Sequence, residues 1–171
     1  MDNIIRIIKD NENYYLNYKE LNEICYIGKN GLTKNKIEGD FKTPIGLFDL
    51  GIVFGIHKKE ELSLNNHIEY YQINKNLFWV DDPNSKYYNN LVDITKVEKD
   101  WISAENLLDN KKPYEYAIEI KSNPHNIPGK GSAIFIHCKT KNYTAGCISI
   151  EKEKMKKLLA SIDEKTKILI W

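Results

Sequence analysis

The sequence predicts a mainly β fold with short helices, arranged as a mixed β-sandwich or a barrel-like sheet. Three observations indicate this class. Short runs rich in β-branched and aromatic residues recur along the chain, and turns rich in Gly, Asn and Asp separate them. Two stretches alone have the apolar spacing of a helix. No repeat, low-complexity tract or linker interrupts the 171 residues, so we expect a single domain over residues 1–171.

The strands are predicted from local pattern and turn signals. Residues 4–8 and 14–18 flank a turn rich in Asn and Asp, which favours an N-terminal β-hairpin within the same domain. A strand over residues 24–27 ends at the turn Gly28–Gly31. Further strands are expected at residues 47–53, 116–120, 132–138, 146–150 and 167–171.

Two segments predict helices. Residues 100–108 begin with Asp100, which is suited to capping, and carry apolar residues at helical spacing. A second, amphipathic helix follows residue 150 and is expected to pack on the sheet. Its apolar residues lie at positions i, i+3, i+4 and i+7, namely Met155, Leu158, Leu159 and Ile162.

Composition excludes several classes of partner. The formal net charge of +1 gives no electrostatic reason to bind nucleic acid or an anionic membrane. Three cysteines leave at least one thiol unpaired, and no apolar stretch approaches the ~20 residues of a membrane span. Residues 1–3 begin no signal peptide, so the protein is either cytosolic or has lost a signal and anchor. We expect a monomer with no cofactor and no metal.

The candidate chemistry lies in residues 131–150. In each of two predicted strands the isoleucines share one face, which we expect to be the core, and a reactive residue lies on the other face. That residue is His137 in the first strand and Cys147 in the second. We expect the two strands to pair antiparallel as a hairpin, which would bring facing Cβ atoms to about 5 Å.

A thiol beside an imidazole predicts nucleophilic catalysis. A cysteine thiol with a pKa near ~8.5 is mostly protonated at neutral pH, and an adjacent imidazole can accept its proton. Gly146 lets a substrate carbonyl approach main-chain N–H groups, which could form an oxyanion hole. These residues indicate acyl transfer through a thioester. A papain-like enzyme is disfavoured, because His137 precedes Cys147 by ten residues and does not follow it.

Structural roles are the alternative for each reactive residue. A lone strand cysteine is usually a small buried hydrophobe, and a lone histidine is usually structural. We favour catalysis because His137 and Cys147 are expected on facing arms, the cysteine directly after Thr-Ala-Gly. Cys138 shares the isoleucine face and is expected in the core. A zinc site made of these three residues is disfavoured, because neighbours on a strand diverge.

This segment resembles the catalytic segment of the L,D-transpeptidase (YkuD-type) domain, in which a strand-borne His precedes a loop and a Ser/Thr-x-Gly-Cys motif. The matching residues are Ile-Phe-Ile-His at 134–137 and Thr-Ala-Gly-Cys at 144–147. Lys-Thr-Pro-Ile-Gly-Leu-Phe at 42–48 resembles the segment that enters the central sheet of the same family. The resemblance covers roughly residues 23–171 and implies the β-rich L,D-transpeptidase fold.

The resemblance assigns roles to the matched residues. Cys147 would be the nucleophile, His137 the general base and acid, and Gly146 with Cys147 part of the oxyanion hole. Many family members carry a His before the Gly and an Arg two residues after the Cys, where this chain has Ala145 and Ser149.

Substrate contacts are expected beside the nucleophile and in one loop. Tyr143, Thr144 and Ala145 directly precede the Gly-Cys pair and are assigned to substrate binding. Trp79 opens residues 79–90, a polar stretch studded with aromatic residues and predicted to be a loop. Such a loop can line a groove for a peptide or a sugar-linked peptide, or can be purely structural.

The resemblance implies a cysteine acyltransferase that forms 3-3 cross-links between peptidoglycan stem peptides and releases D-Ala. Carbapenem β-lactams would acylate the same cysteine. Such enzymes work outside the membrane, at the cell wall, which favours a trimmed signal or anchor. Three alternatives stay open: an L,D-carboxypeptidase that uses water as acceptor, a non-catalytic peptidoglycan-binding module, and a cytosolic thiol hydrolase that acts on another amide.

Overall fold

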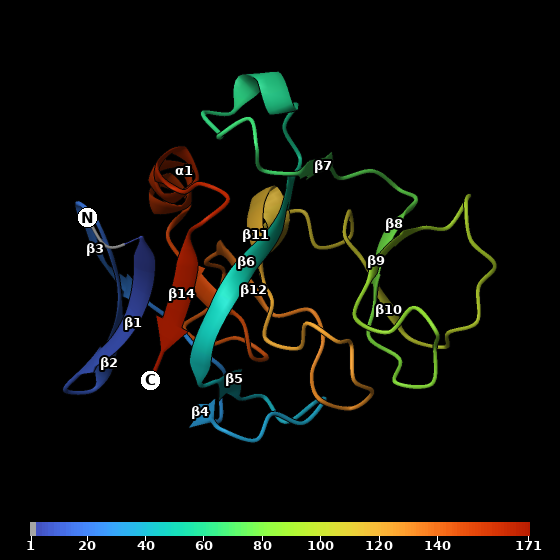
Figure 1. The fold of residues 1–171 in the computed structure, drawn as a ribbon, viewed down its shortest axis with the longest axis horizontal. Helices are drawn as coiled ribbons and strands as arrows, with labels where there is room; N and C mark the ends of the chain where they lie inside the picture. The colour runs from blue at the N-terminus through green and yellow to red at the C-terminus, as the bar shows by residue number, and fades with distance from the viewer. Residues whose placement is uncertain (1–2) are drawn as a thin grey trace.

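A computed structural model describes residues 3–171, so residues 1–2 of the signal-peptide prediction lie outside the described residues. Within this range a nine-stranded mixed sheet curls until it nearly closes into a barrel (Figure 1). Its order is β13-β12-β11-β6-β14-β1-β2-β3, and β7 pairs with β6 beside this path. The predicted mainly β, barrel-like class is therefore confirmed.

The elements have the following bounds. The strands are β1 (Ile4–Asp10), β2 (Asn13–Tyr18), β3 (Leu21–Cys25), β4 (Leu32–Thr33), β5 (Thr43–Pro44), β6 (Gly46–Gly55), β7 (Tyr70–Gln72), β8 (Leu77–Val80), β9 (Leu91–Asp93), β10 (Ala104–Asn106), β11 (Tyr116–Ile120), β12 (Phe135–Cys138), β13 (Ile148–Ile150) and β14 (Lys167–Ile170). The helices are the 3₁₀ turns η1 (Lys59–Glu61) and η2 (Pro113–Glu115), and α1 (Lys152–Ser161).

The N-terminal hairpin closes the barrel. The predicted pairing of β1 with β2 is confirmed, and β1 also pairs in parallel with the last strand, β14. Beyond β3 the chain continues to Tyr26, which exchanges two backbone hydrogen bonds of 2.9 Å with Ser149 of β13. The two edges of the sheet thus meet at Tyr26 and Ser149.

The isoleucine face of the sheet forms the main core, as the alternation predicts. Ile136 of β12 and Ile148 of β13 are fully buried there, and Cys138 joins them. The predicted amphipathic helix is confirmed as α1, whose Met155, Leu158 and Leu159 are buried. The helix packs against β3, β11 and β12.

A second cluster of buried side chains lies on the opposite face of the sheet. It packs between the main sheet and a small three-stranded sheet of order β10-β8-β9. Figure 1 shows the small sheet beside the main one. Aromatic rings meet edge to face in it: Phe135 lies 5.0 Å from Phe54 and 4.8 Å from Trp79, centroid to centroid. Cys147 belongs to this second cluster and not to the main core.

The predicted hairpin of β12 and β13 is wrong. The two strands pair in parallel, with His137 beside Ser149. Parallel neighbours need a connection that carries the chain back to the first end of the sheet. Here the returning chain follows the extension of β3, where the Thr144 N–H donates to the Ile27 carbonyl (2.9 Å).

The predicted helix at residues 100–108 is also wrong. Residues 104–106 form strand β10, in which Glu105 pairs with Trp79 of β8. Asp100 caps no helix, because its carboxylate accepts hydrogen bonds from the Ser85 hydroxyl (2.5 Å) and the Lys86 N–H (3.1 Å). The predicted loop at residues 79–90 begins too early, since Trp79 lies inside β8.

Within residues 3–171 no helix combines the length and the apolar character that crossing a membrane would require.

Removing a buried side chain of α1 is expected to destabilise the fold. Leu158→Ala empties fully buried volume against the sheet, so the free energy of unfolding should fall by about 2–5 kcal/mol in urea denaturation. Lys157→Ala, on the exposed side of the same turn, should change it by no more than about 0.5 kcal/mol. Equal losses in the two variants would contradict this packing.

Candidate active site

Cys147 and His137 line one cavity of about 470 Å³. Tyr143, Thr144 and Ala145 line the same cavity, so five of the predicted site residues come together there. Trp79 does not join them: its side chain is 2 % exposed and packs in the second cluster. The described residues contain no group of three or more His, Cys, Asp or Glu side chains that could hold a metal ion.

The Cys147 thiol is held by the backbone of the strand beside it. Its S–H donates to the Ala133 carbonyl (3.2 Å), and its sulfur accepts the Phe135 N–H (3.3 Å). Burial raises the pKa of the Cys147 thiol to about 12, against the smaller opposing effect of the Phe135 N–H. The resting thiol is therefore protonated at neutral pH.

The His137 imidazole is oriented to accept a proton. Its Nδ1 lies 2.9 Å from the Cys138 carbonyl. A carbonyl oxygen only accepts, so Nδ1 carries the hydrogen and Nε2 of the neutral ring is left with its lone pair. Burial lowers the pKa of His137. The Tyr114 ring meets the imidazole edge to face at 5.8 Å and limits its rotation.

Two threonines shape the turn that carries Cys147. Gly146 has φ of +142°, a region that side chains disfavour. The Thr144 hydroxyl accepts the Gly146 N–H (3.0 Å) and donates to the Cys147 carbonyl (2.6 Å). Fully buried Thr43 donates to the Gly146 carbonyl (2.8 Å) and accepts the Gly28 N–H (2.8 Å). The Gly146 N–H, expected in an oxyanion hole, is thus engaged with Thr144 in the resting structure.

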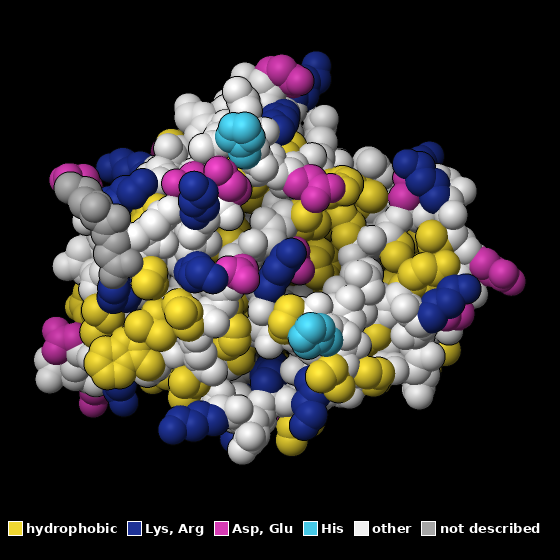
Figure 2. Space-filling model, in the orientation of Figure 1, with side chains coloured by type: hydrophobic (Ala, Val, Ile, Leu, Met, Phe, Trp, Pro, Cys, Tyr) yellow, Lys and Arg dark blue, Asp and Glu magenta, His cyan; other side chains and the backbone are white. Residues whose placement is uncertain are grey.

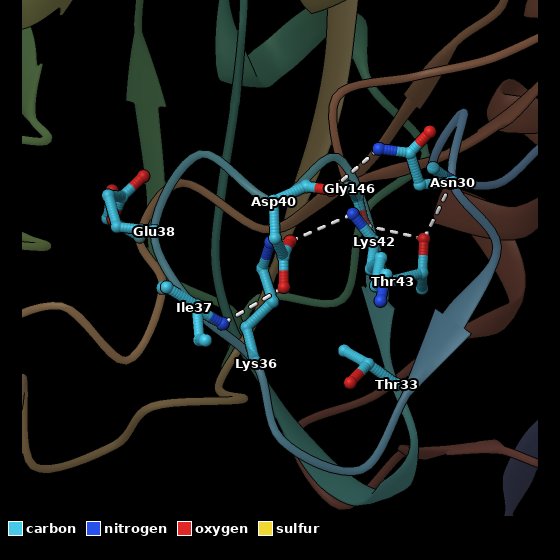
Figure 3. Close-up of polar contacts among 12 residues, drawn as sticks. Asn30, Thr33, Lys36, Ile37, Glu38, Asp40, Lys42, Thr43 and Gly146 are labelled. Carbon is cyan, nitrogen blue, oxygen red and sulfur yellow. Dashed lines mark hydrogen bonds and ion pairs between the residues drawn. The ribbon is translucent and has the colours of Figure 1, made fainter.

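A loop organised by Asp40 brings a lysine to this turn (Figure 3). The Asp40 carboxylate accepts the Ile37 N–H (3.0 Å), the Lys42 N–H (2.9 Å) and the Lys36 ammonium. Burial alone would raise the pKa of Asp40, but these bonds outweigh it and the pKa is lowered. The Lys36 side chain is 9 % exposed and lines the cavity. A Cβ atom on Gly146 would lie 3.4 Å from Lys36 Nζ.

Sequence reasoning missed Lys36, because its interest comes only from its position near Gly146, which is distant in the sequence. The segment around it carries a Lys and an Asp four residues apart, a pattern that occurs on many exposed surfaces.

Three carboxylates also line the cavity, those of Glu38, Asp81 and Glu105. The Tyr114 hydroxyl donates to Glu105 Oε2 (2.5 Å), and burial raises the pKa of Glu105. Glu38 accepts the Ser132 hydroxyl (2.8 Å). Sequence reasoning missed Glu105 because the strand that carries it was predicted to be a helix.

Asn89 ties the small sheet to the backbone that holds the thiol. Its Oδ1 accepts the Trp79 indole N–H (3.2 Å) and the Ala133 N–H (3.1 Å). Its Nδ2 donates to Asn126 Oδ1 (3.0 Å) and to the Asn123 carbonyl (3.3 Å). Ala133 has φ of +53°, which is unfavourable for a residue with a Cβ. Asn89 therefore stabilises a strained conformation in the backbone that bonds to the Cys147 thiol.

The two departures from the family motif have different surroundings. Ala145, where many members carry His, is exposed at the cavity. Ser149, where many carry Arg, is 1 % exposed, and its hydroxyl has no hydrogen-bond partner among residues 3–171. A long cation at position 149 would need a wider opening than this arrangement provides.

The chain matches a family model described as YkuD, the L,D-transpeptidase catalytic domain, over residues 2–170. The match includes the N-terminal hairpin and so exceeds the sequence resemblance, which covers roughly residues 23–171. A comparison with curated proteins finds no match.

The raised pKa of Cys147 predicts how its alkylation depends on pH. The thiolate fraction of a thiol with a pKa of about 12 rises with pH throughout the range below that value. Its reaction with iodoacetamide should therefore accelerate about tenfold per pH unit between pH 7 and 9. Peptide mapping by mass spectrometry assigns the label to Cys147. A rate independent of pH in this range would indicate a preformed thiolate and imidazolium, and would contradict the neutral resting pair.

Loss of the Asn89 amide is expected to make Cys147 more accessible to alkylation without unfolding the rest of the protein. In Asn89→Ala the Ala133 N–H loses its acceptor, so local opening should expose Cys147 and raise its alkylation rate roughly tenfold. Cys25, which is buried in the main core and not in the second cluster, is the internal control. If Cys25 and Cys147 accelerated equally, the effect would be global unfolding, and Asn89 would have no positioning role.

Proposed function

Because the chain belongs to the YkuD family of L,D-transpeptidase catalytic domains, which act on peptidoglycan, we propose that it is a cysteine-dependent acyltransferase on stem peptides. The observation that carries this proposal is the shared cavity, in which a buried thiol and an imidazole with a free Nε2 lone pair face the same space. A thiol and a base in one cavity are the parts that acyl transfer needs.

The first half-reaction forms the thioester. The S–H of Cys147 turns from the Ala133 carbonyl to His137 Nε2, which takes the proton as sulfur attacks the carbonyl carbon of the third stem residue. The tetrahedral oxyanion collapses, the amide bond to the terminal D-Ala breaks, and the imidazolium returns the proton to the leaving amine. The thiol is neutral until substrate arrives, so activation accompanies binding.

The second half-reaction resolves the thioester. An amine from the third residue of another stem gives its proton to His137 and attacks the carbonyl, and Cys147 leaves and is reprotonated. The product is a 3-3 cross-link. Water in place of the amine yields a tripeptide, which is the L,D-carboxypeptidase reaction. Exclusion of water from the cavity decides between them.

The charges of the cavity suit a zwitterionic peptide. A stem that ends in D-Ala carries a carboxylate, and a diamino acid at its third position carries an ammonium group. Lys36, beside the turn at Gly146, can bind the carboxylate, and the carboxylates of Glu38, Asp81 and Glu105 can bind the ammonium group. We place the protein outside the cytoplasmic membrane, where this substrate lies.

Intact-mass spectrometry with disaccharide-tetrapeptide tests the proposal. We expect a transient adduct on Cys147, loss of D-Ala and accumulation of cross-linked dimer, because the thioester precedes both products. An adduct accompanied only by tripeptide would make the protein a carboxypeptidase. Absence of any adduct would contradict the acyltransferase and leave a binding module.

Cysteine variants provide the controls. Cys147→Ala should abolish the adduct and covalent labelling by a carbapenem, whereas Cys25→Ala and Cys138→Ala should retain both, because these two thiols lie in the main core. Labelling that survived in Cys147→Ala would overturn the assignment of the nucleophile.

A further inference from the structure

A second cavity, of about 660 Å³, lies beyond Trp79 and Asn89 as seen from the nucleophile. It opens between the main sheet, which contributes Ile52 and Glu119, and the small sheet, which contributes Leu77 and other residues. Figure 2 shows hydrophobic side chains between β6 and the β8–β9 strands, with charged groups beside them. The proposed acyl-transfer reaction uses none of this space.

Side-chain amides dominate the polar lining of this second cavity. An amide both donates and accepts, as hydroxyl groups do. Asn89 and Asn123 use their amide donors and acceptors within the protein. Gln72 Oε1 and Asn74 Nδ2 bond to no group within residues 3–171 and can therefore bind a ligand. Charged side chains are balanced, with Asp93 and Glu119 against Lys96 and Lys121, so the cavity has no preference for an ionic ligand. The amides belong to Gln72, Asn74, Asn89, Asn90, Asn123 and Asn126.

One carboxylate in this cavity has an unused acceptor. Glu119 Oε2 accepts the Ile52 N–H (3.1 Å), and no donor within residues 3–171 bonds to its Oε1. The absence of a side chain at Gly51 makes this position possible, because a Cβ atom there would lie 2.0 Å from Glu119 Oε2. Burial raises the pKa of Glu119, and a hydroxyl donor from a ligand would compensate for the lost hydration.

Apolar and aromatic groups complete the lining. Leu77 and Leu91 lie beside the amides, and the Tyr71 ring, 37 % exposed, lies at the same cavity. Sugar rings present apolar faces and hydroxyl edges, and an acetamido substituent adds one amide and one methyl group. Amides next to aliphatic side chains match that substituent, and an aromatic ring matches the sugar face.

From these contacts we propose that the second cavity binds a neutral N-acetylated glycan, the sugar strand to which the stem peptide is attached. The carbohydrate chemistry follows from the cavity, whereas the identity of the strand rests on the proposed function. Asn89 lines this cavity and hydrogen-bonds Ala133, which lines the cavity of Cys147. A sugar-linked peptide thus has adjacent sites for its two parts.

Titration of Cys147→Ala with chitotriose, a β-linked N-acetylglucosamine trimer, tests the inference without acyl transfer. We expect saturable binding with a Kd of about 1 mM, followed by calorimetry and by the NMR shift of the Trp79 indole N–H. In the Cys147→Ala protein, a second change, either Glu119→Gln or Tyr71→Ala, should weaken binding roughly tenfold, because each removes one contact with the glycan. Glu98→Gln, the same change at an exposed residue outside the cavity, should leave the Kd unchanged.

Several outcomes would overturn the glycan site. These are no binding of chitotriose, equal binding of maltotriose, which lacks N-acetyl groups, and an unchanged Kd in both cavity variants. Tyr71 is partly exposed, so Tyr71→Ala keeps the test valid if Glu119→Gln fails to fold. Carbapenem labelling of the parent protein is measured separately: labelling without glycan binding would reject this inference alone, and loss of both would reject the proposed function as well.

Discussion

The parallel pairing of β12 with β13 is the constraint on which the site depends. With His137 beside Ser149 in this register, Cys147, two residues before Ser149, lies at the level of Phe135, two residues before His137. The thiol therefore meets the Phe135 N–H and the Ala133 carbonyl. An antiparallel hairpin would have placed thiol and imidazole on facing residues instead. In the observed arrangement they lie two residues apart along neighbouring parallel strands, and both side chains line one cavity.

Burial sets the resting chemistry of this site. Because desolvation penalises charge, it raises the pKa of the Cys147 thiol and lowers that of His137, so both groups are neutral together. A neutral thiol reacts more slowly with oxidants and electrophiles than a thiolate does. The charged side chains of Lys36, Glu38, Asp81 and Glu105 line the same cavity.

The small sheet and its loop lie between the cavity of Cys147 and the second cavity. Trp79 of β8 packs in the same buried cluster as Cys147, and Asn89, in the loop that follows β8, accepts a hydrogen bond from the Ala133 N–H. The same loop lines the amide-rich cavity on its other side. One segment thus supports the strained backbone beside Cys147 and lines a second cavity. Loops carried on a rigid sheet are a common place for such sites.

Local periodicity by itself predicted the amphipathic helix and the strand at residues 116–120. It also predicted that the isoleucines lie in the core and that His137 and Cys147 lie on the opposite face. These follow from side-chain alternation within a strand or helix. Only the tertiary structure decided that β12 and β13 run parallel, that residues 104–106 form a strand, and that Lys36 and Asn89 lie near Cys147. The physical reason is that these features depend on hydrogen bonds between segments far apart in the sequence, such as Thr43 with Gly146 and Asn89 with Ala133, which no local pattern encodes.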